Sequence, residues 1–239
     1  MRNQIADQPR RCLTLLIRWF LFLAMICAVA EAQTPASASA DPGLKPILDY
    51  ISSAWGTLTR SMNDCVSVVD PKIKVAPVLY LPAEVSEPEG VHKLAADCNV
   101  RVEHLPVQIH RLGEIDTGKI QPHGLLYLPE KYVVPGGRFN EMYGWDSYFI
   151  IRGLLRAGRV DLARGMVDNF FFEIEHYGAM LNANRTYYLT RSQPPFVSSM
   201  VVDVYRAAHE AKKENPPDDR AWLERAYADL SKDLSLIHI

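Results

Sequence analysis

The stretch PGGRFNEMYGWDSY, residues 135–148, combines features that a core segment and a surface loop do not usually share. It holds two adjacent glycines, one arginine and two carboxylates, together with one tryptophan and three other aromatic rings. A second stretch, LNANRTYYLTRSQPP at residues 181–195, repeats this mixture of planar donors, amides and rings. Each stretch stands immediately before a segment with helical periodicity.

This inventory of side chains suits a sugar. A pyranose has an apolar C–H face that packs on an aromatic ring, and a rim of hydroxyls that both donate and accept hydrogen bonds. Small-molecule sites combine such apolar platforms with a few placed polar groups. Gly136 and Gly137 permit a tight turn, or close approach of the backbone to a ligand, directly before Arg138. The two stretches therefore predict a carbohydrate site.

Structural roles for the same residues are the alternative. Arg138 and Glu141 would then form a buried ion pair that holds the loop, and Asp146 would only cap its helix. Tyr148 follows Trp145 by three residues on a helix, so we expect Tyr148 to be a core residue. Spacing alone keeps the ion pair and the ligand contact as equal interpretations of Arg138.

Helical periodicity dominates after Tyr143. We expect helices over residues 145–156, ending near Gly158, and from an N-cap at Asp161 to Gly178. Two more follow Pro194-Pro195 and the segment 212–219, and an earlier one covers residues 45–62. The expected buried faces are Leu48, Ile51, Trp55, Leu58 and Met62; Met200, Val201, Val204, Tyr205 and Ala208; and Leu223, Ala226, Tyr227 and Leu230.

This pattern predicts an all-α fold of helical hairpins, either an α/α toroid or a solenoid. The proline-rich segment 75–135 interrupts it with short extended pieces, PVLYLP, NVRVEHLP and GLLYLP, and we expect an irregular structure there.

The first 32 residues have the layout of a signal peptide. Arginines precede the apolar run WFLFLAMICAVA, and Ala30-Glu31-Ala32 fits a cleavage site. The run is short of the roughly 20 apolar residues of a membrane span, so an uncleaved anchor is the weaker alternative. We expect removal of residues 1–32, a flexible leader over 33–44, a periplasmic or secreted protein, and no membrane partner after cleavage. Cys65 and Cys98 would remain, and their spacing leaves a disulfide open.

Charge and histidine spacing argue against other classes of partner. The formal net charge of −2 gives no basic surface for nucleic acid. His92, His104, His110 and His123 show no metal-ligand spacing, so we expect no metal.

On these residues, the chain resembles the α,α-trehalases, the glycoside hydrolases that split trehalose. Residues 135–148 resemble the first signature of that family, and NANRTYYLTRSQPP is similar to the segment that follows it. The resemblance runs from about Leu125 onward and implies an (α/α)6 barrel, an inverting mechanism, trehalose as substrate and no cofactor. It implies contacts with glucose hydroxyls for Arg138, Trp145, Asp146, Asn182, Arg191, Ser192 and Gln193.

An inverting glycosidase also needs two carboxyl groups about 6.5–9.5 Å apart. In the family, the acid is an aspartate in a Gly-Trp-Asp-like motif far downstream of the Arg-Ser-Gln segment, and the base is a later glutamate. Neither motif follows Gln193 in this sequence, and LSLIHI at residues 234–239 resembles a translated sequencing adapter. We therefore expect residues 45–239 to be part of a catalytic domain, inactive without its catalytic pair. The alternatives are a complete sugar-binding protein and a related (α/α)6 hydrolase of another α-glucoside.

Overall fold

A computed structural model describes residues 43–69, 76–211 and 217–237. The predicted signal peptide, and all but the end of the predicted leader, lie outside the described residues. The chain divides into two compact units, Met1–Asp49 and Tyr50–Ile239. In the first unit the structure describes residues 43–49, where Lys45 Nζ lies 2.7 Å from Asp49 Oδ2.

The helix expected over residues 45–62 is present as α2 (Lys45–Leu58), but it ends four residues earlier than expected, so Met62 lies outside it. Its apolar face is only partly covered, because Leu48 and Ile51 are 50% and 42% exposed. Trp55 packs partly against the core, next to Gly153. A Cβ at Gly153 would lie 2.9 Å from Cη2 of Trp55, so the close approach of that ring requires glycine.

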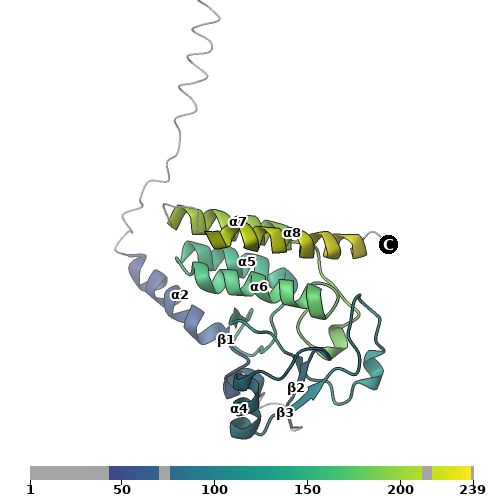
Figure 1. Ribbon diagram of the computed structural model, residues 1–239. Helices are drawn as coiled ribbons and strands as arrows, with labels where there is room; N and C mark the ends of the chain where they lie inside the picture. Colours follow the sequence, from purple (N-terminus) through teal and green to yellow (C-terminus); the bar gives the residue numbers. More distant parts are fainter. Residues whose placement is uncertain (1–42, 70–75, 212–216, 238–239) are drawn as a thin grey trace, which may run out of the picture. The chain divides into compact units, whose positions relative to one another are not determined.

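The segment expected to be irregular contains a small parallel sheet, and this is the main difference from the expected fold. Its strand order is β3-β2-β4, with Val78 opposite Arg101 and Leu79 opposite Leu125. All four residues of β2 are buried, as is typical of a central parallel strand. Helix α4 makes the crossover that parallel pairing requires. The elements are β2 (Val78–Leu81), α4 (Glu89–Cys98), β3 (Arg101–His104) and β4 (Leu125–Leu126) (Figure 1).

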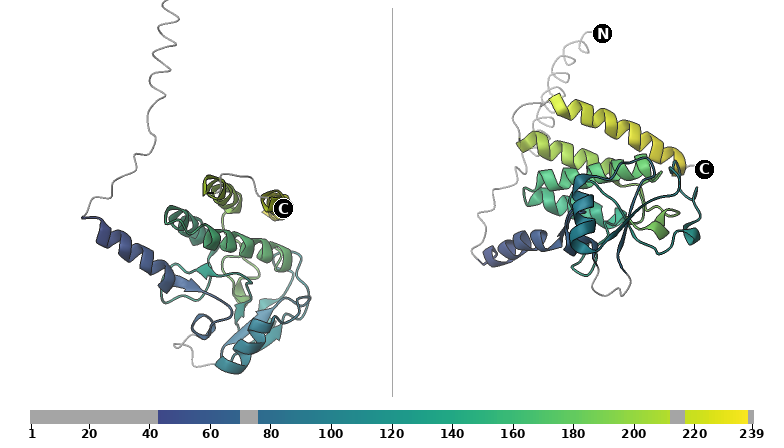
Figure 2. Two further views of the ribbon diagram at one scale, coloured as in Figure 1. Left: turned by 60° about the vertical axis from the view of Figure 1, so that its left-hand side comes forward. Right: turned by 60° about the horizontal axis from the view of Figure 1, so that its bottom comes forward.

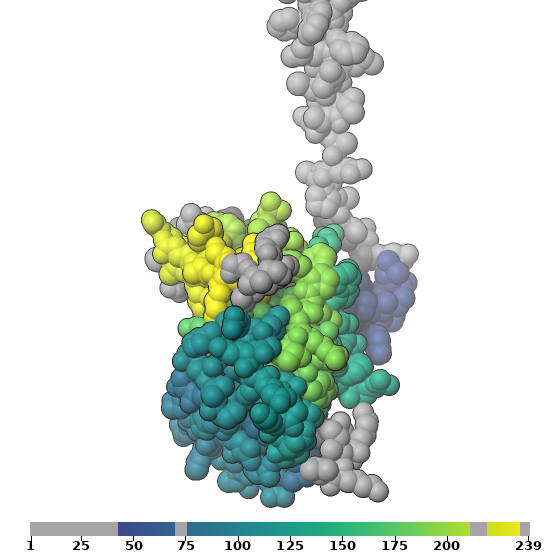
Figure 3. All heavy atoms as spheres, turned by 90° about the vertical axis from the view of Figure 1, so that its right-hand side faces the viewer, coloured from purple at the N-terminus to yellow at the C-terminus, as the bar shows by residue number. Residues whose placement is uncertain are grey.

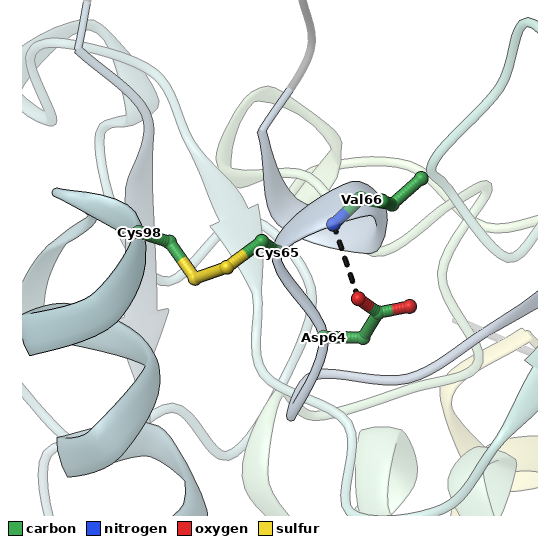
Figure 4. Close-up of a disulfide and its surroundings, with 4 residues drawn as sticks. All are labelled: Asp64, Cys65, Val66 and Cys98. Carbon is green, nitrogen blue, oxygen red and sulfur yellow. Dashed lines mark hydrogen bonds between the residues drawn. A yellow bond between two sulfur atoms is a disulfide. The ribbon is translucent and has the colours of Figure 1, made fainter.

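A disulfide fastens the end of α4 to the short helix α3 (Cys65–Val68). The two cysteines, Cys65 and Cys98, have Cα atoms 5.5 Å apart (Figure 4). The carboxylate of Asp64 caps α3 by accepting a hydrogen bond from Val66 N at 3.2 Å. The pairing that the cysteine spacing left open is thus present in the structure.

Four helices follow and pack side by side, with α7 and α8 lying over α5 and α6 in Figures 1 and 2. Helix α6 is the most enclosed: Met166, Phe170, Phe171 and Ile174 are fully buried. In space-filling form, the yellow α8 and the green segments beside it lie above the blue-green segment that holds the sheet (Figure 3). The helices are α5 (Gly144–Arg156), α6 (Val160–His176), α7 (Val197–Ala211) and α8 (Pro217–Ile237).

The ends of α5 and α6 agree with the sequence prediction, but the start of α6 does not. Gly158 and Gly178 have positive φ, +70° and +87°, and follow α5 and α6 as predicted. The N-cap of α6 is Arg159, and Asp161 lies in the first turn. The prediction of Asp161 as N-cap is wrong because aspartate is favourable at both positions, so its presence does not distinguish them.

Burial follows the predicted face in α7 but departs from it in α2, where Leu48 and Ile51 are exposed, and in α8. Met200, Val201 and Val204 of α7 are buried, as expected. Tyr227 of α8 is 77% exposed, although it was expected on the buried face. The mostly helical class is nevertheless confirmed.

Two further short elements lie next to the candidate site. Strand β1 (Thr59–Arg60) pairs antiparallel with β5 (Tyr132–Val133), and Arg60 stands opposite Tyr132. Two 3₁₀ turns, η1 (Thr117–Lys119) and η2 (Thr186–Tyr188), complete the connections.

Candidate functional site

Main-chain contacts bring the two polar-aromatic stretches together. Tyr143 and Ala183 form an isolated antiparallel bridge, and Gly144 N donates a hydrogen bond to Asn182 O at 3.2 Å. A Cβ on Gly144 would lie 2.9 Å from the carbonyl oxygen of Leu181. Glycine at the start of α5 is therefore what lets the second stretch approach so closely.

The second stretch also folds back on itself and reaches α5. Asn182 N donates to Arg191 O at 2.9 Å, and Ser192 Oγ donates to Gln193 O at 3.2 Å. The side-chain oxygen of Gln193 accepts a hydrogen bond from Trp145 N. Six of the seven residues that the resemblance singles out thus lie on adjoining segments: Trp145, Asp146, Asn182, Arg191, Ser192 and Gln193.

The seventh residue, Arg138, reaches the same region through neighbouring rings. Its guanidinium carbon lies 4.9 Å from the centroid of the Phe139 ring. The Phe139 ring in turn meets Tyr143 edge to face, at 5.6 Å between centroids. Arg138 therefore belongs to the turn that precedes the bridged residue Tyr143.

The seven side chains are accessible to different degrees. Trp145 is 40% exposed, and Arg138 and Arg191 are exposed as well, whereas Asp146, Asn182, Ser192 and Gln193 are half-buried. A group that contacts a ligand needs such access, and a core residue does not.

Glu141 forms a nearly buried ion pair with Arg185. Oε1 of Glu141 lies 2.6 Å from Nε of Arg185, and the two side chains are 11% and 12% exposed. Oε2 of Glu141 also accepts a hydrogen bond from Asn140 N at 3.1 Å. The carboxylate that was considered as a structural partner of Arg138 therefore faces Arg185, in the second stretch. Sequence spacing did not indicate this pair, because it registers only residues that are near in the chain.

An aromatic cluster covers the start of α5. The rings of Tyr148 and Phe196 stack at 4.8 Å, and Trp145 meets Phe196 edge to face at 5.2 Å. Tyr148 is half-buried and packs against the core, as expected for this residue. Of these three rings Trp145 is the most exposed, and so the one best placed to receive an apolar sugar face.

Burial strengthens the preference of the Tyr143 phenol for its neutral form. It raises the pKa of Tyr143 to about 12, and the Glu141 carboxylate and the nearby Tyr188 and Tyr187 act in the same direction. Tyr143 thus keeps its O–H, which can donate a hydrogen bond, to a higher pH than an ordinary tyrosine does.

Two buried polar residues, Asn184 and Glu173, support the two stretches through hydrogen bonds to the main chain. Sequence reasoning missed both. Asn184, fully buried, accepts from Met142 N at 2.8 Å and donates to Leu126 O at 2.9 Å. Glu173, in α6, accepts from Leu181 N at 3.0 Å. A signal was present for Glu173, since it is a single carboxylate within the apolar run FFFEI.

The environment of Glu173 is strongly desolvating. Burial raises its pKa well above the ordinary 4.5, and the Asp233 carboxylate of α8 adds to this effect. Asp233 itself accepts a hydrogen bond from Met180 N at 3.1 Å, and burial raises its pKa as well. Two carboxyl groups from different helices thus bind consecutive amides directly before Asn182.

Two features are absent from residues 43–69, 76–211 and 217–237. No group of three or more His, Cys, Asp or Glu side chains is placed there to hold a metal ion. No helix within these ranges is both long and apolar enough to cross a membrane.

Comparison with known sequences finds trehalases. The chain is 48% identical over 183 residues to the probable trehalase of Eremothecium gossypii, covering 77% of this chain and 22% of that protein. It is 65% identical over 140 residues to the cytosolic neutral trehalase of Kluyveromyces lactis, covering 59% of this chain and 17% of that protein. It is 48% identical over 118 residues to the periplasmic trehalase of Xanthomonas campestris, covering 49% and 21%. The chain thus spans about a fifth of the length of these relatives.

These relatives overturn the expected location. Several of them, including the Kluyveromyces lactis enzyme, are cytosolic neutral trehalases, while the periplasmic relative aligns over a smaller share of the chain. The prediction of a periplasmic or secreted protein is therefore wrong as stated. It rested on a short apolar run behind arginines, a compositional pattern that specifies little more than local hydrophobicity.

The fold comparison agrees with the sequence comparison. Neutral trehalase Nth1 from Saccharomyces cerevisiae superposes with a TM-score of 0.67 at 35% identity, over 79% of this chain and 38% of that chain. That enzyme is an (α/α)6 barrel, which confirms the predicted fold class. The sequence profile of the Trehalase family matches residues 78–237, which include both polar-aromatic stretches. The chain belongs to the trehalase family.

Proposed function

We propose that this chain supplies part of the substrate pocket of a glycoside hydrolase that cleaves α,α-trehalose to glucose with inversion. The observation that carries the proposal is the joining of two stretches, 38 residues apart at Tyr143 and Leu181, into one accessible surface of arginines, amides and aromatic rings. The main-chain bridge between Tyr143 and Ala183 is its centre.

Each of the seven residues has a role in this proposal that its chemistry suits. The guanidinium groups of Arg138 and Arg191 present several donors in a fixed plane, which matches neighbouring sugar hydroxyls. Asp146 and Asn182 supply acceptors, and the ring of Trp145 supplies an apolar platform. Ser192 and Gln193 lie at the edge of the proposed pocket, and the side-chain oxygen of Gln193 accepts a hydrogen bond from Trp145 N.

The carboxylates behind this surface are already engaged. Glu141 is paired with Arg185, and Glu173 is fully buried and bound to Leu181 N. A general acid must reach the glycosidic oxygen, and a general base must reach the attacking water. We therefore propose that Glu141 and Glu173 are not the catalytic pair, and that residues 45–239 act as one part of a catalytic domain.

The test separates binding from hydrolysis. The purified 239-residue chain is titrated with trehalose in saturation-transfer NMR, and glucose release is measured in parallel. We expect saturable binding of trehalose, weaker binding of maltose as the matched α-glucoside, and no glucose. Absence of trehalose binding would contradict the proposed pocket. Sustained glucose release would instead place the chemistry within this chain, with Glu141 and Asp146 as the first residues to substitute.

A further inference from the structure

We propose that Arg60 is a positioning residue for this site: it holds the turn that carries Arg138 and thereby sets sugar affinity without contacting the sugar. The inference rests on the proposed function. Arg60 lies in β1, before the residues 78–237 that match the family profile, so the family match assigns it no role.

The guanidinium group of Arg60 spans the turn on both sides of Arg138. Its Nη2 donates to Gly137 O at 3.2 Å, and its Nε donates to Asn140 Oδ1 at 3.4 Å. The same group is anchored at its other edge, where Nη1 donates to Thr57 O at 3.0 Å and to Thr59 O at 3.1 Å. One side chain therefore links the end of α2 to the turn over residues 137–140.

The partner strand reinforces this arrangement. Tyr132 stands opposite Arg60 in the β1–β5 pair and is fully buried. Its hydroxyl donates to Asn140 O at 2.7 Å. Arg60 thus binds the side chain of Asn140, and Tyr132 binds the main chain of the same residue. Together they support the turn from one side.

Burial of the Arg60 guanidinium group carries a desolvation cost. Arg60 is only 7% exposed, and burial of a cation is unfavourable unless its donors are satisfied. The turn itself is near the surface, with Gly137 and Arg138 exposed, so fixing it adds little to the core. This desolvation cost is offset if Arg138 contacts a ligand. A side chain that is already held in place loses less conformational freedom on binding.

Lysine cannot replace this fork. An ammonium group is a point charge with three donors, whereas the guanidinium plane reaches acceptors at two edges. Arg60→Lys therefore keeps the charge and loses the span. We expect roughly 3- to 10-fold weaker trehalose binding, the range that corresponds to ordering one side chain on association.

The experiment follows the turn and the ligand separately in the 239-residue chain. Hydrogen exchange is measured for the amides of residues 136–143 and of α6, and trehalose binding is measured by NMR titration, for the parent chain, Arg60→Lys and the exposed control Arg156→Lys. We expect faster exchange at residues 136–143 and weaker binding only in Arg60→Lys, with α6 unchanged. In an Arg138→Ala background, Arg60→Lys should weaken binding no further.

Three results would overturn the inference. One is unchanged exchange of the turn in Arg60→Lys, and the second is an equal loss of affinity with and without Arg138. The third is faster exchange in α6 as well, which would make Arg60 a general stability residue. If the parent chain fails to bind trehalose, the proposed function fails, while the exchange of the turn still tests the positioning by Arg60.

Discussion

Nε of Arg185 and Oε1 of Glu141 lie 2.6 Å apart, and this contact ties together the two stretches that form the candidate sugar site. Both side chains are nearly buried, so little water competes for either charge. Glu141 also accepts a hydrogen bond from Asn140 N, which extends the link into the turn held by Arg60. The candidate site is therefore braced by charge–charge and charge–dipole contacts.

Removal of either partner of this pair should destabilise the chain strongly. Glu141→Gln or Arg185→Met leaves one buried charge uncompensated, a loss of about 3–5 kcal/mol of unfolding free energy. The double variant should lose less than the sum of the two, because no charge is then left unpaired. Urea unfolding of the four chains measures this coupling. Strictly additive losses of unfolding free energy would show that the contact contributes nothing. The control is Glu224→Gln in the exposed Arg220–Glu224 pair, where the loss should be small.

Arg191→Ala should affect ligand binding far more than folding. Arg191 is exposed, and loss of a charged hydrogen bond to substrate weakens binding by about 1.5–3 kcal/mol, or about one to two decades. Trehalose titration and thermal unfolding of the same preparation separate the two effects, with Arg156→Ala as the exposed control. A variant that melts early but binds normally once folded would make Arg191 a structural residue.

The buried carboxyl groups beneath the second stretch should make stability decline as the pH rises. Burial raises the pKa of Glu173 well above 4.5, and that of Asp233 above 3.8, so the folded chain holds protons that the unfolded chain releases. Their contribution is fully present below the unfolded values and is lost as the pH rises through the folded ones. Asp229 of α8, whose pKa burial also raises, acts in the same direction.

Glu173→Gln tests this pH dependence directly. The amide oxygen can still accept the hydrogen bond from Leu181 N, but the side chain no longer titrates. The free energy of unfolding, measured in urea between about pH 4.5 and 8, should fall less steeply for the variant than for the parent. Parallel curves would assign the pH dependence to other groups.

The disulfide should contribute to stability through the unfolded state. Cys65 and Cys98 are separated by 33 residues, and closing a loop of that size stabilises the folded chain by roughly 3–4 kcal/mol in the chain-entropy treatment. A reducing agent should lower the melting temperature of the parent chain and leave the Cys65→Ser/Cys98→Ser variant unchanged. Equal melting of the reduced and oxidised parent would show that the link adds no constraint.

The helices could be predicted from the sequence because their signals are local. The apolar period of Met200, Val201 and Val204, and the glycines 158 and 178, act within one or two turns of backbone. The parallel sheet could not be predicted in this way. Its strands β2 and β3 are short, and each becomes a strand only when its partner is present.

In the candidate site, too, local features could be predicted from the sequence and long-range contacts could not. The sequence by itself determined the chemistry of the two stretches and their family, because side-chain type and order are enough to specify a motif. It also gave the seven candidate contact residues, which stay a prediction. Only the tertiary structure decided that Glu141 pairs with Arg185 and that Arg60 holds the turn of Arg138. These contacts join residues 44 and 77 positions apart in the chain, and burial in a common environment, not sequence spacing, selects the partner of a buried charge.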